Sequence, residues 1–423
     1  MIQRPDHEPA RTFQQPNKLR DNASLHARSL GCVTCLERSI CGGVHTDAGV
    51  FDCNDLCTCK DRTTCDMVCR SKPQHFVAFM REINGFDLNN TPRVASVSSE
   101  SLPAVIPLID HRSGRESVLQ EPIVGLSLYD LVDFSTGKIR ATSRRWLSER
   151  FLIPESARIV LTGVEKDPKL ERWWRLADRR SVLKGLAALG IDLITAPNFS
   201  VLSDVPRTDN LHAMKRILIS WCEIMGAGIP AALHLNARTE HDYSRWATLI
   251  RARPEIELIA FEFATGCGRG DRLAWHVRQL CRLADEVGRP LILVMRGGTR
   301  ALETLKQHFA AISLLETDAF ARTMRRREAY HLPSGQLKWR KHPTERGAPL
   351  DDLLARNIET VRRSYTEEAK AILPALRRRP ARRGAPDRNS KTIEPSLLSK
   401  FDLPRQARAV SEDRHRPIPA AKP

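Results

Sequence analysis

The chain has 423 residues, which is enough for one barrel-sized domain and a smaller module. Hydrophobic residues make up 41% of it, as in an ordinary folded protein, and no apolar run is long enough to cross a bilayer, so we expect no membrane association. The formal net charge of +17 favours anionic partners, of which nucleic acid is the commonest, and it is also compatible with an anionic substrate.

Residues 1–28 are polar and contain several prolines, which predicts a disordered N-terminus. They include no apolar stretch of the kind that a signal peptide needs. We therefore expect a cytoplasmic protein in a reducing compartment.

Eight of the eleven cysteines fall in one short segment. They are Cys32, Cys35, Cys41, Cys53, Cys57, Cys59, Cys65 and Cys69. In a reducing compartment such a cluster indicates metal ligands rather than disulfides. Eight thiolates suit two four-ligand sites, and the spacing within Cys32/Cys35, Cys53/Cys57 and Cys65/Cys69 is typical of tetrahedral zinc.

The one-residue interval between Cys57 and Cys59 is unusual for a zinc knuckle. Iron–sulfur clusters also take four thiolates each, so a 4Fe-4S cluster stays open as the alternative metal group. We expect a cysteine-rich metal-binding module over residues 29–85, with zinc as its metal.

From about residue 104, short apolar runs alternate with amphipathic segments. The runs expected to be strands are Ala104–Ile109, Ile123–Leu128, Arg158–Leu161, Ile191–Thr195, Ala231–Leu235, Leu258–Phe263, Leu291–Met295 and Ile312–Leu315. The expected helices between them are Ser181–Ala188, Asp209–Met225, Glu240–Ala252, Asp271–Val287 and Thr299–Phe309. Strands that are apolar throughout indicate a parallel sheet buried on both faces. Seven or eight such βα steps favour an α/β fold of the TIM-type (β/α) barrel class over a doubly wound sheet.

A last amphipathic helix, Leu350–Ala371, is expected to pack on the barrel, which then spans residues 104–371. Residues 372–423 are spaced by prolines and basic: from Arg377 to Pro423 there are 13 Lys/Arg against 5 Asp/Glu. This composition predicts a disordered basic tail, which either keeps the protein soluble or contacts nucleic acid.

Chemistry in TIM-type barrels takes place at the C-terminal ends of the strands, so polar residues there are the candidates. Glu262 lies between Phe261 and Phe263 inside an apolar strand. Burial should raise the pKa of this carboxyl group towards the range useful for acid–base catalysis. The structural alternative is an ion pair with Arg296 of the next strand.

His234 and Asn236 follow the preceding strand and share one of its faces, since side chains alternate with a period of two. His234 is a candidate general base or metal ligand, or a hydrogen-bonded core histidine. Asn236 is a candidate for orienting a substrate.

Arg296 is followed by Gly297 and Gly298 at the start of an expected helix. Exposed amides, the helix dipole and the guanidinium group would together bind an anion. We therefore count all three residues, together with Asn198, as candidate substrate-binding residues. There are two further basic stretches, Arg325–Arg327 and Leu337–Lys341. In the second, Trp339 lies between basic residues and could stack on a base or pack on the barrel.

The stretch Leu193–Pro206, with the later Gly228-Ile229-Pro230, resembles a bacterial and phage family known only as a domain of unknown function. Its pattern is similar to (S/T)-P-D-F-S-x-x-x-D-x-P, and this chain carries Asn198 where the family has Asp. The resemblance covers about residues 195–265 and implies no established activity.

Three hypotheses follow. The first is an enzyme acting on a nucleic acid or a phosphorylated small molecule, with Glu262 as acid or base. The second is a non-catalytic nucleic-acid-binding protein that uses the cysteine module and the basic tail. The third is an iron–sulfur redox enzyme.

Overall fold

The computed structural model describes residues 82–202, 207–268, 270–345 and 347–376, and the account below concerns the unit that these residues form up to Pro374. The predicted disordered N-terminus, all eight clustered cysteines and nearly all of the predicted basic tail lie outside the described residues.

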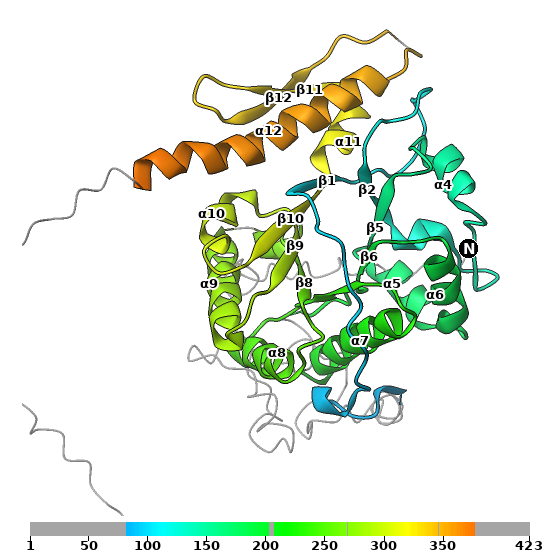
Figure 1. Cartoon of the computed structure of the whole chain (residues 1–423), viewed down its shortest axis with the longest axis vertical. Helices are drawn as coiled ribbons and strands as arrows, with labels where there is room; N and C mark the ends of the chain where they lie inside the picture. The colour runs from blue at the N-terminus through cyan, green and yellow to red at the C-terminus, as the bar shows by residue number, and fades with distance from the viewer. Residues whose placement is uncertain (1–81, 203–206, 269, 346, 377–423) are drawn as a thin grey trace, which may run out of the picture. The chain divides into compact units, whose positions relative to one another are not determined.

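The central element is an eight-stranded parallel sheet in the order β1-β10-β9-β8-β7-β6-β5-β2 (Figure 1). Its strands are β1 (Val105–Pro107), β2 (Ile123–Ser127), β5 (Arg158–Thr162), β6 (Leu193–Thr195), β7 (Ala231–His234), β8 (Leu258–Glu262), β9 (Ile292–Arg296) and β10 (Ala311–Glu316). The two outer strands meet through a parallel bridge between Leu108 and Gly125, so the sheet is a nearly closed barrel. This confirms the mixed α/β class and is consistent with the predicted TIM-type barrel.

Helices cover the outside of the barrel. They are α4 (Arg144–Phe151), α5 (Asp167–Trp174), α6 (Arg179–Ala188), α7 (Arg207–Gly226), α8 (Glu240–Ala252), α9 (Gly270–Val287), α10 (Leu302–Leu305), α11 (Asp318–Thr323) and α12 (Asp351–Leu376), with short 3₁₀ turns η3 (Leu88–Asn90), η4 (Leu128–Leu131), η5 (Gly266–Gly268) and η6 (Thr299–Ala301). Two small antiparallel pairs lie outside the barrel sheet: β3 (Val132–Asp133) with β4 (Lys138–Ile139), and β11 (Arg327–His331) with β12 (Leu337–Lys341).

Apolar side chains form two separate layers, as a barrel requires. The inner layer fills the barrel and consists of Ile106, Ile123, Val160, Leu193, Ala232, Leu258, Ala260, Val294 and Leu315. The outer layer lies between the strands and the helices and includes Trp173, Trp221 and Trp246, which are fully buried. Burial on both faces explains why the strands read as continuous apolar runs.

Residues 82–104, the start of the described chain, are held against the barrel by side chains of α7 and of the residue that follows α8. The Lys215 ammonium group of α7 contacts the Asp87 carbonyl and Asn90, and Arg253 after α8 donates to the Thr91 carbonyl at 2.7 Å. The segment then crosses the N-terminal end of the barrel, where Leu102 packs on the inner apolar layer. The catalytic end of such a barrel is the opposite one.

One predicted helix is shorter than expected. Thr299–Phe309 was predicted as a single helix, whereas the structure has the turn η6, the four-residue helix α10 and further turns. Leu302, Leu305 and Phe309 are buried, and the Ala310 amide already donates to the Leu291 carbonyl at 2.9 Å. The chain must return to the sheet within these few residues, which ends the helix early.

Candidate active site at the barrel mouth

A layer of polar side chains closes the C-terminal end of the barrel. Side chains alternate along a strand, so the apolar inner layer places the last inward residue of six strands in one ring. These residues are Ser127, Thr162, Thr195, His234, Glu262 and Arg296. The first five are buried, and 26% of the Arg296 side chain is exposed. We call this ring the polar layer.

Several atoms of the polar layer have no hydrogen-bond partner among the described residues. They are Ser127 Oγ, His234 Nε2, Glu262 Oε2 and Arg296 Nε. Thr195 differs, because its Oγ1 accepts from the Gly163 amide at 2.9 Å. A buried polar atom without a partner costs about 1–3 kcal/mol, so this cluster of unpaired atoms calls for a ligand or water.

His234 lies at the end of β7 and is 3% exposed. Burial first, and the nearby charge of Arg296 second, lower its pKa from 6.5 to about 3. The imidazole is therefore neutral at neutral pH and can form hydrogen bonds without carrying charge.

Glu262 at the end of β8 pairs in register with Arg296 of β9. Their Oε2 and Nε atoms are 3.6 Å apart, which is an ion pair too long for a hydrogen bond. Burial raises the pKa of Glu262, while Arg296 and the Ala264 and Thr265 amides oppose the rise. The structure is therefore compatible with both sequence interpretations of Glu262, because its carboxyl group has a raised pKa and also an ion-pair partner in Arg296.

Three carboxylates at the mouth were not among the predicted site residues. Burial, helped by the charge of Asp130, raises the pKa of Asp110, and burial also raises that of Asp130. Burial acts in the same direction on Glu165, but hydrogen bonds from Lys169 and the Lys166 amide outweigh it and lower the pKa. Lys169 contacts Glu165 at 2.9 Å and Asp130 at 3.8 Å. Asp110 comes three residues after β1, and this position beyond the end of a strand is the sequence signal that could have identified it.

Asn198 and Asn236 contact one another. The Asn236 side-chain amide donates to Asn198 Oδ1 at 3.2 Å and to the Phe199 carbonyl at 2.9 Å. This links the loops that follow β6 and β7, so both residues shape the mouth. Whether either touches a substrate stays a prediction.

Gly297 and Gly298 have φ angles of 71° and 70°, in the left-handed region. A Cβ atom on Gly297 would lie 2.7 Å from the Ala264 amide nitrogen, and one on Gly298 would lie 2.5 Å from the Phe263 ring. Close packing against the end of β8 therefore accounts for both glycines. The following helix is short, so its dipole adds less to anion binding than the sequence suggests, and Arg296 is the main cationic group.

The structure does not place the predicted metal ligands, because Cys32 to Cys69 precede the first described residue. Among the residues from 82 onward that are described, no group of three or more His, Cys, Asp and Glu side chains is arranged to hold a metal ion. The three remaining cysteines, Cys222, Cys267 and Cys281, are buried and unbridged.

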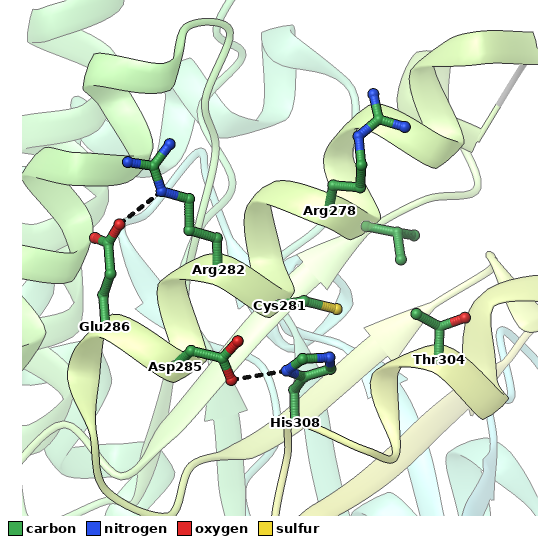
Figure 2. Close-up of a pocket in the computed structure, with 8 residues that line it drawn as sticks. Arg278, Cys281, Arg282, Asp285, Glu286, Thr304 and His308 are labelled. Atoms are coloured by element: carbon green, nitrogen blue, oxygen red, sulfur yellow. Dashed lines mark hydrogen bonds and ion pairs between the residues drawn. The ribbon is translucent and has the colours of Figure 1, made fainter. Parts of the chain in front are cut away.

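A cavity of about 580 Å³ lies between α9 and α10 on the outside of the barrel (Figure 2). It brings Cys281 together with His308, whose Nδ1 lies 2.7 Å from Asp285 Oδ1. Burial, helped by the charge of Asp285, raises the pKa of the Cys281 thiol. The sulfur is therefore a protonated thiol and a weak nucleophile, so this cavity is a weaker candidate for an active site than the barrel mouth.

The chain matches no protein-family model and no curated protein. The resemblance over residues 195–265 therefore stays a prediction. None of the described helices has the length and apolar character needed to span a membrane.

Proposed function

We propose that the barrel is an enzyme acting on a small molecule that carries an anionic group such as a phosphate. Arg296 would bind the anionic group, Glu262 would transfer a proton, and the neutral His234 would orient the reacting group through a hydrogen bond. The supporting observation is that Ser127, His234 and Glu262 each place a buried polar atom without a hydrogen bond in one layer beside a half-buried arginine.

The raised pKa of Glu262 suits this role. A carboxyl group whose pKa lies nearer to neutrality can both accept and donate a proton. Its Oε1 is held by the Ala264 amide at 2.5 Å, which leaves Oε2 as the oxygen that faces a reacting atom.

The remaining charges favour a small substrate over nucleic acid at this site. Asp110, Asp130 and Glu165 would repel a polyanion laid across the mouth. A molecule with a single anionic group is attracted by Arg296 and meets less of this repulsion than a polyanion does.

The test is a ligand screen on the full-length protein followed by kinetics. Inorganic phosphate, pyrophosphate, sugar phosphates and nucleotides are each tested for a rise in the melting temperature. We expect a binder whose stabilisation disappears in Arg296→Gln and persists in Arg300→Gln, an exposed arginine of the same loop. Binding that survives Arg296→Gln would contradict the assignment.

For a substrate found in this way, Glu262→Gln should lower turnover by about 100- to 10,000-fold and leave binding intact. Glu257→Gln is the control, since Glu257 is exposed just before the same strand. Full activity in Glu262→Gln would refute its role as acid or base.

A further inference from the structure

The hairpin formed by β11 and β12 carries charge that the proposed enzymatic function does not use. From Asp318 to Lys341, seven Lys/Arg stand against two Asp/Glu, a net charge of +5. Two of the cations have acidic partners: Arg322 lies 3.5 Å from Asp318, and Arg340 lies 2.8 Å from Glu328. The other five, for which no ion pair with a described residue is found, are Arg325, Arg326, Arg327, Lys338 and Lys341.

The hairpin is held rigidly, so these cations have a defined arrangement. Asn357 of α12 is fully buried and accepts from the Ala329 amide at 2.8 Å. Its side-chain amide donates to the Arg327 carbonyl and to Thr323 Oγ1, both at 2.8 Å. On the same face, His331 contacts Ser364 of α12 at 2.6 Å. Figure 1 shows the hairpin lying along α12.

The strand register separates the two faces of the hairpin. Trp339 stands opposite the buried Ala329, packs against the apolar core and has Arg322 over its ring at 5.2 Å. It is therefore a packing residue rather than a free platform for a base. Tyr330 and Lys338 stand opposite each other on the outer face, where Arg340 covers the tyrosine ring at 5.2 Å.

Two features at one end of the hairpin are unfavourable for the protein alone. Arg327 and Lys341 are directly opposite each other in register, and like charges in that position destabilise a sheet. Arg326, the residue before the strand, has a φ of 52°, in the left-handed region that non-glycine residues rarely adopt. A bound polyanion would relieve the repulsion between Arg327 and Lys341.

We propose that this end of the hairpin, Arg325–Arg327 with Lys341, binds the phosphate backbone of nucleic acid. Contact through phosphates is favoured because the aromatic rings are already covered, so we expect little sequence preference. An anionic membrane is the less suitable partner. Surface-bound proteins usually insert large apolar side chains, and the exposed ones in the described chain, Val118 and Leu202, do not belong to the hairpin.

The test measures nucleic-acid affinity of the full-length protein over a series of salt concentrations, by fluorescence anisotropy with a short labelled DNA duplex. The double variant Arg327→Gln/Lys341→Gln should lower the slope of log affinity against log salt by about two units, since each lost phosphate contact removes about one. The control Lys184→Gln/Arg278→Gln removes the same charge from exposed positions on α6 and α9 and should leave the slope unchanged.

The same double variant separates binding from folding. Without nucleic acid its melting temperature should equal or exceed that of the wild type, because the cross-strand repulsion is gone. An equal change of slope in both double variants would overturn the proposal, as would binding to vesicles containing anionic lipid but not to the duplex. None of these outcomes bears on the mouth of the barrel.

Discussion

His234 and Glu262 lie in the same polar layer, and burial moves their pKa values in opposite directions. Burial disfavours the charged form of each side chain, so the pKa of the histidine falls and that of the carboxylic acid rises. The result is a neutral hydrogen-bonding group in the same layer as a carboxyl group whose pKa is raised.

The lowered pKa of His234 makes a prediction about stability at acidic pH. The folded-state pKa, about 3, lies below the ordinary value of 6.5, so the stabilisation is complete above pH 6.5 and is lost as the pH falls towards 3. Between pH 7 and pH 4 the wild type should lose on the order of 3 kcal/mol of unfolding free energy that His234→Gln does not lose.

Urea denaturation across this pH range measures the difference. His241→Gln, which changes an exposed histidine of α8, should follow the wild type. Parallel pH profiles for the wild type and His234→Gln would show that His234 is not held neutral by burial.

Single residues were predictable from the sequence where one strand determines their environment. The flanking phenylalanines and the β8 pattern predicted that Glu262 is buried. They also predicted that Arg296 of the next strand is its neighbour. Asp110 and Glu165 were not predicted as site residues, because each lies three residues beyond the end of its strand and approaches the site only when the barrel closes. The mutual contact of Asn198 and Asn236 also depends on how two loops meet.

At the level of elements, the start of α12 packs on the connection between β1 and β2, which has no helix of its own. Residues 108–122 join β1 to β2 without a helix. The Leu350 amide donates to the Gly114 carbonyl at 2.9 Å, and Asp351 Oδ2 accepts from the Glu116 amide at 2.9 Å. The start of the last helix is therefore fixed to the connection between the first two strands.

The Arg115 side chain makes this contact sensitive to mutation. It is fully buried, donates to the Phe151 and Leu152 carbonyls at 2.7 Å, and has Asp351 as its acidic partner at 3.5 Å. Asp351→Asn keeps the shape but leaves Arg115 without a counter-charge. We expect it to lower the unfolding free energy by about 2 kcal/mol.

Asp352→Asn is the matched control, because Asp352 occupies the same first turn of α12 and is exposed. Both changes remove one negative charge near the helix N-terminus, so the difference between them reports the contacts of Asp351 with Arg115 and with the Glu116 amide. Equal unfolding free energies, measured by chemical denaturation, would show that these contacts of Asp351 contribute nothing.

Most elements of the barrel were predictable because they repeat a strong local pattern. The prediction for α8 matches the observed Glu240–Ala252, which a capping box of Thr239 and Asp242 starts. Helices α4 and α5 were not predicted. Each has eight residues, of which four are charged, so its apolar period is too short to stand out.

At the scale of the whole molecule, most cysteines lie near the start of the chain, whereas basic residues are concentrated in its tail, Arg377–Pro423. The described barrel contains three buried cysteines, whereas the other eight lie before residue 82. We propose that these eight hold two zinc ions, with 4Fe-4S clusters as the alternative.

Elemental analysis of anaerobically purified protein should find about two metal ions per chain. Cys32→Ser/Cys35→Ser should lower this content by about half, whereas Cys281→Ser should leave it unchanged, since Cys281 lies in the described body. Visible absorbance would indicate iron–sulfur clusters instead of zinc. A protein without bound metal would refute the ligand assignment.

The pairing of β1 with β10 has a consequence for biosynthesis. Val105 of β1 lies opposite Leu314 of β10, which comes about 200 residues later in the chain. While the ribosome is still making the intervening segment, the nascent polypeptide carries a sheet with open edges, which are prone to associate with other chains. Completion of the ring must therefore wait until almost the entire barrel has been translated, and a premature stop before residue 311 would release an unclosed, aggregation-prone product.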